Sequence, residues 1–221
     1  MKIGIVAHKD RRDQAWRVFQ RVRADFISID EGKIGPRANH LRVWDRLVQM
    51  SEPGEWLVVL EDDAVLCRHF MTQLSNVTCW CPRDISVISL YMGRLRPMQY
   101  QDRMKQAVAL AESRNACWIT YNTTIHAVGL AMDHDDASNF MYHVRTLQGN
   151  PRPIDETMAG WCRMSKRKVG YCYPSIVNHM DDGTLIKHPD GAERQKGRVA
   201  WKFGGRDRWS RVSIPLDPNH P

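Results

Sequence analysis

The sequence predicts an α/β protein with a mostly parallel sheet flanked by helices. Three short apolar runs, at residues 2–7, 26–30 and 56–60, have the length and composition of strands that are buried on both faces. Segments with helical periodicity separate these runs, and strand, helix and strand in this order imply parallel pairing with a right-handed crossover. The 221 residues, 43% of them hydrophobic, suffice for one substantial core, so the length favours one domain over two.

The first ninety residues alternate between strands and helices. We expect a strand at 2–7, a basic loop at 8–12, a helix at about 13–23 and a strand at 26–30, and then a Gly/Pro loop at 32–38 before a helix at 39–50. A helix at 67–77 and a strand at 84–90 follow the central strand. Nucleotides bind at the carboxyl ends of such strands, although the first loop lacks the Gly-x-Gly-x-x-Gly pattern of classical dinucleotide folds.

Three consecutive carboxylates, Glu61, Asp62 and Asp63, come directly after the central strand. Mutual repulsion and partial desolvation would raise their pKa values, so such a cluster persists most easily opposite a cation or a network of donors. Oxygen ligands suit Mg²⁺ or Mn²⁺, which are often shared with substrate phosphates. The alternative is a solvated acidic turn. The buried strand before the acids and Ala64-Val65-Leu66 after them favour a site.

The second half is expected to contain a basic loop at 93–97, a helix up to about residue 114, and a pair of strands at 118–121 and 126–132. A helix should run from His134 to about Leu147, and Asp135-Asp136 in its first turn is explained by the helix dipole. Two prolines bring the chain to another helix start at Asp155 and Glu156. A strand is expected near residues 169–173.

Charge and cysteine content limit the class of protein. The net charge of +7 and the pI near 9.2 favour an acidic partner, such as nucleotide phosphates, nucleic acid or an anionic glycan. No apolar run approaches 18 residues and no signal h-region is present, so we expect a cytoplasmic protein without a membrane partner. Six cysteines without paired CxxC spacing indicate reduced, mostly buried thiols rather than a zinc site.

Three segments resemble glycosyltransferases that use nucleotide sugars and have the GT-A fold. These segments are Leu60-Glu61-Asp62-Asp63-Ala64-Val65-Leu66, residues 150–156 with their Pro-x-Asp sequence, and residues 169–184 with Pro174-Ser175 and His179. The chain is most similar to the lipopolysaccharide-type family 25 and to related bacteriophage enzymes. The resemblance implies a Rossmann-type catalytic domain at about 1–190, with a nucleotide-sugar half at 1–90 and an acceptor half at 91–190.

The resemblance also implies roles for individual residues. A nucleotide-diphosphate sugar, with uridine diphosphate as the expected carrier, would contact Ala7, His8, Arg11, Asp30 and Asn39, although helix capping is a simpler account of Asn39. Asp63 and His179 would hold Mn²⁺ or Mg²⁺, Asp62 would face the ribose or base, and Glu61 would orient the other acids. Asp155, with Glu156 in reserve, would be the general base of an inverting reaction, and helix capping explains Asp155 almost equally well.

The C-terminal tail, residues 191–221, interleaves cations with aromatic residues. This composition suits a phosphate backbone and stacked bases, or a segment that packs over the donor pocket and neutralises the diphosphate. We expect DNA with a hydroxymethylated pyrimidine as the acceptor, followed closely by protein or glycan. A nucleotidyltransferase or a non-catalytic nucleic-acid-binding protein are further alternatives. The residues assigned to nucleic acid are Arg198, Trp201, Lys202, Arg206, Arg208, Trp209 and Arg211.

Overall fold

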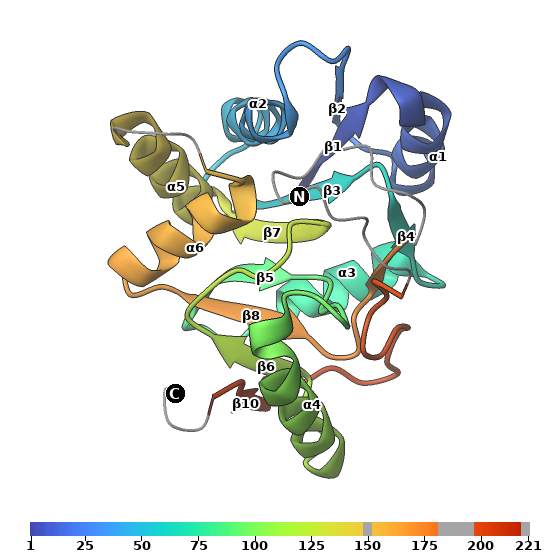
Figure 1. The fold of residues 1–221 in the computed structure, drawn as a ribbon, viewed down its shortest axis with the longest axis vertical. Coiled ribbons are helices and arrows are strands. Elements are labelled where there is room, and N and C mark those ends of the chain that lie inside the picture. The colour runs from blue at the N-terminus through green and yellow to red at the C-terminus, as the bar shows by residue number, and fades with distance from the viewer. Residues whose placement is uncertain (148–151, 181–196, 218–221) are drawn as a thin grey trace.

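An eight-stranded mixed sheet forms the centre of the molecule, with helices on both faces (Figure 1). The computed structural model describes residues 1–147, 152–180 and 197–217. The strand order is β10-β6-β8-β5-β7-β3-β1-β2. Strands β1, β2, β3, β5 and β8 run in one direction and β6, β7 and β10 in the other. The predicted α/β class with a mostly parallel sheet is therefore confirmed.

The N-terminal half follows the expected alternation of strands and helices. Its elements are β1 (Lys2–His8), a 3-10 helix (Lys9–Arg11), α1 (Arg12–Val22), β2 (Phe26–Asp30), α2 (Pro36–Gln49), β3 (Trp56–Glu61), β4 (Ala64–Leu66), α3 (Phe70–Cys79) and β5 (Ile85–Ser89). Strand β1 pairs in parallel with both β2 and β3, as the crossover rule predicts.

The C-terminal half adds three helices and five strands to the described fold. These elements are α4 (Met98–Ser113), β6 (Trp118–Tyr121), β7 (Gly129–Asp133), α5 (His134–Thr146), α6 (Ile154–Met164), β8 (Lys168–Cys172), β9 (Val177–His179) and β10 (Ser213–Pro215). Strand β9 pairs with β4 in a separate two-stranded sheet. No helix in the described part of the chain is both long and apolar enough to cross a bilayer.

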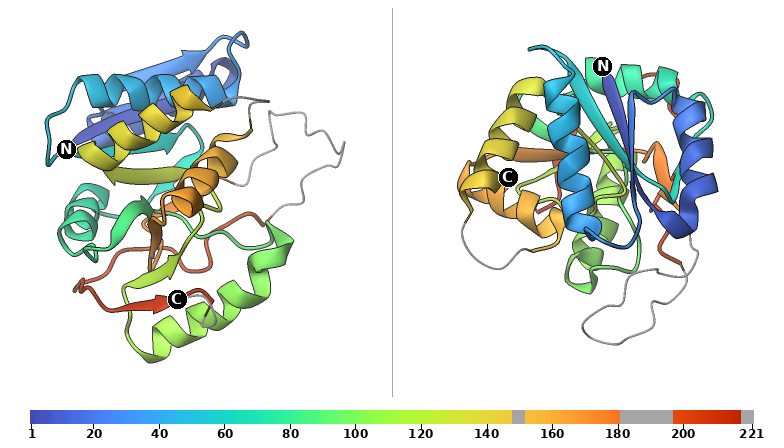
Figure 2. Two further views of the ribbon diagram at one scale, coloured as in Figure 1. Left: turned by 90° about the vertical axis from the view of Figure 1, so that its left-hand side faces the viewer. Right: turned by 90° about the horizontal axis from the view of Figure 1, so that it is seen from above.

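Two hydrophobic clusters cover the two faces of the sheet, which Figure 2 shows from two further sides. Helices α1 and α3 pack on one face, through residues such as Val18 and Leu74. Helices α2, α4, α5 and α6 pack on the other face, where Trp44 and Phe140 are fully buried. All six cysteines are free, and five of them are buried, as expected. Helices on both faces leave the carboxyl edge of the parallel strands available for a site.

Several predicted bounds and one predicted pairing differ from the structure: α3 begins at Phe70 rather than at residue 67, and β7 begins at Gly129 rather than at residue 126. Helix α2 begins at Pro36, three residues earlier than expected, because proline at the first helical position has the right φ and needs no hydrogen bond there. Strands β6 and β7 do not form the predicted pair: β6 lies between β10 and β8, whereas β7 lies between β5 and β3. Strands that follow each other in the sequence need not be neighbours in a mixed sheet.

The described part of the expected tail is built into this fold. Strand β10 forms one edge of the sheet and pairs in parallel with β6. Ala200 forms a β-bridge with Gly93, and Phe203 forms one with Ser175. The boundary expected at residue 190 lies outside the described residues, but residues 197–217 belong to the same core as the rest of the chain.

Candidate functional site

A cavity of about 390 Å³ lies at the carboxyl ends of β1, β2 and β3. In the parallel register, His8 of β1 is opposite Asp30 of β2, and Val6 is opposite Glu61 of β3, so the polar strand ends meet at one edge. The volume lies in the range of about 300–1,000 Å³ that is typical of small-molecule sites. The lining residues are Val6, Ala7, His8, Arg11, Asp30, Gly32, Gly35, Pro36, Asn39, His40, Glu61, Asp62, Asp63, His179 and Arg198.

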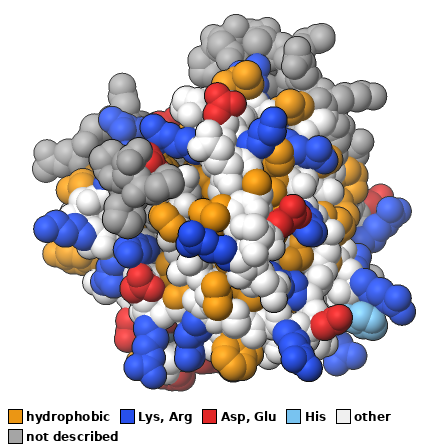
Figure 3. Space-filling view, turned by 90° about the horizontal axis from the view of Figure 1, so that it is seen from below, with side chains coloured by type: hydrophobic (Ala, Val, Ile, Leu, Met, Phe, Trp, Pro, Cys, Tyr) orange, Lys and Arg blue, Asp and Glu red, His pale blue; other side chains and the backbone are white. Residues whose placement is uncertain are grey.

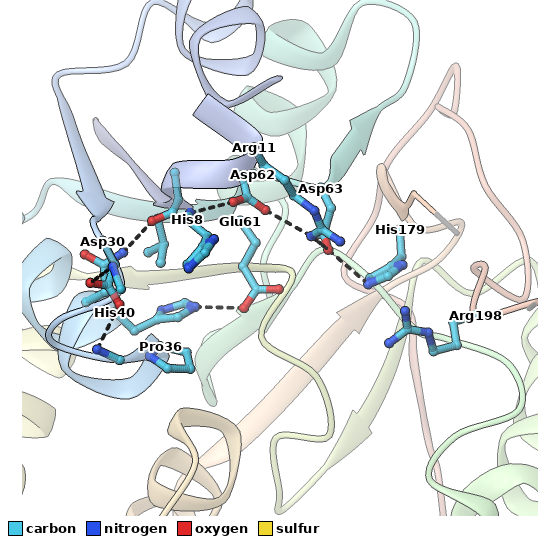
Figure 4. A pocket seen from close by; sticks show the side chains of 15 residues that line it. His8, Arg11, Asp30, Pro36, His40, Glu61, Asp62, Asp63, His179 and Arg198 are labelled. Carbon is cyan, nitrogen blue, oxygen red and sulfur yellow. Dashed lines mark hydrogen bonds and ion pairs between the residues drawn. The ribbon is translucent and has the colours of Figure 1, made fainter. Parts of the chain in front are cut away.

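The cavity has two ends with the carboxylates between them (Figure 4). Asp30, Pro36 and His40 lie at one end, and His179 and Arg198 lie at the other. Every residue that sequence reasoning assigned to the nucleotide or the metal lines this cavity, as does Arg198 from the expected tail. The topology therefore brings together residues from the first and last quarters of the chain.

Arg11 bridges the second and third acids of the cluster. Its Nη1 atom lies 3.2 Å from Asp62 Oδ1 and 2.6 Å from Asp63 Oδ2. The backbone N–H of His8 donates to Asp62 Oδ2 at 2.8 Å. The 3-10 helix that follows β1 thus folds back onto the turn after β3. Two of the three predicted acids are held by the loop that was expected to bind the nucleotide.

Burial raises the pKa values of Asp62 and Asp63, and the positive charge of Arg11 offsets this effect only in part. Burial and the neighbouring Glu61 raise the pKa of Asp63 to about 7, although Arg11 opposes the shift. Burial also raises the pKa of Asp62, against the His8 N–H and Arg11. The two carboxylates in turn hold the pKa of Arg11 above its usual value, despite partial burial. The cluster is therefore electrostatically suited to accept a further cation.

Glu61 makes a different contact from the one we expected. Its Oε1 atom lies 3.0 Å from His40 Nε2, and among the described residues no hydrogen bond joins Glu61 to either aspartate. Although burial disfavours its charge, the hydrogen bond and charge of His40 lower the pKa of Glu61. The His40 side chain is only 1% exposed. Sequence reasoning missed His40, whose signal is a polar residue on the inward face of α2.

Asp30 and Asn39 organise the other end of the cavity through contacts within the protein. Four backbone N–H groups, those of residues 32, 33, 34 and 35, donate to the Asp30 carboxylate at 2.8–3.1 Å. These bonds lower the pKa of Asp30 in spite of its burial. Asn39 is not a helix cap: it donates to the carbonyls of Ala7 and Ser28, and its Oδ1 accepts from the Ser28 hydroxyl. Both side chains shape the cavity wall.

His179 reaches the acids through the small sheet. Strand β9 pairs with β4 so that His179 is opposite Ala64, the residue directly after Asp63. The Met180 N–H donates to the Asp63 carbonyl at 2.9 Å, and His179 Nε2 lies 3.3 Å from Asp63 Oδ2. The predicted neighbourhood of Asp63 and His179 is therefore present in the structure.

The residues at this point fit a divalent cation that receives only part of its ligands from the protein. Asp63 Oδ1 is buried and has no hydrogen-bond partner among the described residues, so one lone-pair site is left for a ligand. Within the described ranges, no three His, Cys, Asp or Glu side chains converge as a metal-binding group. Mg²⁺ is commonly held by one or two carboxylates together with substrate phosphates and water, and this is the mode that the residues fit.

Asp155 and Glu156 do not line the cavity. They lie in the first turn of α6, where Asp155 is half-buried and Glu156 is exposed. Burial raises the pKa of Asp155, and the charge of Glu61 adds to the shift. The capping account fails in its simple form, since Pro153 is the N-cap residue and Asp155 accepts from the adjacent Glu156 N–H.

Most of the tail residues that we assigned to nucleic acid contact the protein itself. Arg206 donates to the carbonyls of Asn115, Ala116 and Tyr173. Trp209 is 6% exposed and donates to Gln73, and Trp201 packs against one of the two core clusters. These side chains fix the C-terminal segment to the domain, so they are not available to stack on bases.

The other assigned cations outside the cavity are exposed but are mostly engaged in contacts. Lys202 pairs with Glu112, and Arg211 lies over the Trp80 ring and donates to the Cys81 carbonyl. Arg208 is exposed. On the face seen in Figure 3, Lys and Arg side chains are scattered among neutral and apolar ones. A continuous basic stripe, which is the usual footprint of a nucleic-acid interface, is not visible on this face.

Comparisons with known proteins give only coarse similarity. No protein-family model and no curated protein matches the chain. The chain is similar to the crystal structure of A197 from STIV, with a TM-score of 0.47 and 10% identity over 97% of this chain and 99% of that one. It is also similar to the inositol-1-phosphate CTP transferase from T. maritima, with a TM-score of 0.37 and 6% identity over 78% and 66% of the chains. Similarity at this level carries no functional information.

Proposed function

We propose that the protein is a metal-dependent glycosyltransferase that uses a nucleotide-diphosphate sugar. One observation carries the proposal: Asp63, with a buried and unpartnered Oδ1 atom among the described residues, faces His179 in the same cavity as Arg11 and Arg198. A carboxylate with a vacant lone-pair site beside several nitrogen donors suits a cation–diphosphate pair. The open edge of a parallel sheet is a further reason to place a nucleotide here.

The geometry favours one orientation of the donor. The nucleoside would occupy the end formed by Ala7, Gly35 and Pro36, where Asp30 and Asn39 hold the walls. The diphosphate would lie between Asp63 and the pair His179 and Arg198. This orientation places phosphates next to the cationic groups and leaves the apolar strand end for the base.

The chemistry of transfer would be shared between this cavity and α6. When bound, the cation would supply charge that stabilises the departing nucleotide diphosphate. Arg198 and His179 would donate hydrogen bonds to the same phosphates. Asp155, whose pKa is raised by burial, would accept the proton of the acceptor hydroxyl as that hydroxyl attacks the anomeric carbon. A retaining reaction would leave Asp155 without this task.

The acceptor that we propose is a hydroxymethylated pyrimidine in DNA, with protein and glycan acceptors as alternatives. The net charge of +7 and the resemblance to bacteriophage enzymes support it. Three of the tail residues first assigned to DNA are engaged within the protein, namely Trp201, Arg206 and Trp209. We therefore assign the DNA contact to exposed cations such as Arg94, Arg96 and Arg208. A base in duplex DNA would have to be flipped out to reach the cavity.

Two measurements test the proposal in sequence. Calorimetric titration with uridine diphosphate and Mn²⁺ should show binding to the wild type that is lost in Asp63→Ala, while Asp102→Ala on the exposed face of α4 retains it. Mass spectrometry of nucleosides from modified and unmodified DNA, incubated with a panel of nucleotide sugars, should then show a hexose-sized gain on one modified base. Equal binding by wild type and Asp63→Ala would refute the metal site. Donor hydrolysis without DNA modification would move the acceptor to protein or glycan.

A further inference from the structure

Tyr91 lies behind the phosphate end of the cavity and contacts both of the residues that form it. The residue follows β5 and is 3% exposed. Its ring centroid lies 6.2 Å from that of His179 and 5.0 Å from that of His126, the latter in an edge-to-face arrangement. The ring is therefore packed between two histidines of different segments, and one of these histidines lines the cavity.

The hydroxyl group of Tyr91 holds the segment that carries Arg198. It donates to the Arg198 carbonyl at 2.8 Å, although 107 residues separate the two in the chain. The residues directly after Arg198 are fixed by backbone bonds, from Arg94 N to the Val199 carbonyl at 2.8 Å and from Trp201 N to the Met92 carbonyl at 3.0 Å. Tyr91 thus provides a side-chain contact to the backbone of Arg198 itself.

Gly93 is shaped around this tyrosine. A Cβ atom at Gly93 would lie 2.3 Å from the Tyr91 hydroxyl and 2.7 Å from the ring carbon that bears it. Such a contact forces the hydroxyl to move. A side chain at this position would therefore displace Tyr91 without changing Tyr91 itself. Glycine here keeps the hydroxyl within reach of the Arg198 carbonyl.

We propose that Tyr91 is a positioning residue for the phosphate-binding wall of the cavity. Its ring sets the orientation of His179, and its hydroxyl sets the backbone from which the Arg198 side chain enters. The ligand group that this wall receives is the diphosphate of a nucleotide, so the inference rests on the proposed function. Tyr91 itself lies outside the cavity lining and acts through the two residues that it contacts.

The test uses variants that separate the hydroxyl from the ring. Tyr91→Phe removes one hydrogen bond and keeps the packing, and Gly93→Ala displaces the hydroxyl. Tyr142→Phe is the matched control, because Tyr142 is 69% exposed on α5. Calorimetric titration with uridine diphosphate and Mn²⁺, and with pyrophosphate and Mn²⁺, should show affinities about three- to tenfold weaker for Tyr91→Phe and Gly93→Ala. Tyr142→Phe should bind like the wild type.

A double-mutant cycle distinguishes positioning from general destabilisation. If Tyr91 acts through Arg198, adding Tyr91→Phe to Arg198→Ala should weaken diphosphate binding by less than twofold further, since the residue being positioned is already gone. Hydrogen exchange should show less protection at the backbone amides of residues 199–201 in Tyr91→Phe. Protection in the rest of the domain should match that of the wild type.

The outcomes separate this inference from the function on which it rests. If the wild type binds the diphosphates and Tyr91→Phe binds them with equal affinity, the positioning role is overturned and the proposed function is left intact. Fully additive effects of Tyr91→Phe and Arg198→Ala also overturn it, because they show an action independent of Arg198. Failure of the wild type to bind either diphosphate overturns the proposed function and, with it, the ligand assigned to this wall.

Discussion

Replacement of Asp63 by asparagine should stabilise the protein at neutral and alkaline pH. In the folded state, burial and Glu61 raise the pKa of Asp63 from 3.8 to about 7. The unfolded chain releases this proton near pH 4, whereas the folded chain keeps it up to about pH 7. Wild-type stability therefore falls with rising pH between these values and levels off above them. Asparagine cannot ionise, so the variant lacks this loss.

The size of the effect follows from the displacement of the pKa. A shift of about three units at roughly 1.4 kcal/mol per unit corresponds to a loss on the order of 4 kcal/mol across the whole window. The loss accumulates only up to the folded-state pKa of about 7. From pH 5 to pH 8 it therefore grows over about two pH units, and the stability difference between Asp63→Asn and wild type should widen by about 2–3 kcal/mol.

Urea unfolding at pH 5, 6, 7 and 8, in the presence of a chelator, measures this difference directly. Comparison of the variant with the wild type at each pH cancels the titration of groups that do not interact with Asp63. Asp102→Asn, at an exposed position on α4, is the control and should give a difference that does not vary with pH. A constant difference between Asp63→Asn and wild type would refute the electrostatic account of the acid cluster.

Three other contacts give predictions of their own. Asp30→Asn should lower the free energy of unfolding by about 1–3 kcal/mol at pH 7, since one carboxylate accepts from four loop N–H groups. Because the pKa of Asp30 is lowered in the folded state, this difference from the wild type should vanish only as the pH falls through that lowered value. Urea unfolding at pH 3 and pH 7 measures the difference. Arg206→Ala should cost about 2–4 kcal/mol, because it removes the donor to three carbonyls, while Arg208→Ala should change stability by less than about 0.5 kcal/mol; thermal unfolding compares them. His40→Ala should raise the pKa of Glu61, which carboxyl NMR titration follows, and an unchanged value would contradict the assigned pair.

The strands and the acid cluster could be predicted because their signals are local. The apolar runs that became β1, β2 and β3 are short, continuous and bounded by polar residues. The three acids follow directly from the position of β3. Parallel pairing then brings the carboxyl ends of these strands together, so the location of the cavity follows from the crossover rule.

Other features depend on partners that are distant in sequence and could not be predicted. His40 belongs to the site because it contacts Glu61, and only the pairing of β3 with β1 brings Glu61 next to α2. Strand β10 has three residues, too few for periodicity to show, and its pairing with β6 joins residues that are 95 positions apart, such as Ser213 and Trp118. The interleaved cations and aromatics of the tail predict nucleic-acid contacts by composition, whereas Trp209 is buried and Arg206 is bonded to carbonyls.

The integration of residues 197–217 affects the order in which the protein can assemble during synthesis. Segments β1 to β3 hold the acids and can pair early, since domains begin to fold from the N-terminus as the chain emerges from the ribosome. The wall that carries Arg198 cannot form until residues 198–201 have been translated and have paired with residues 92–94. Contacts of such high sequence separation form late and slowly. A nascent chain would therefore display its acidic cluster, held by Arg11, before it acquires Arg198, and the cavity would become complete only after residues 198–201 have emerged and paired.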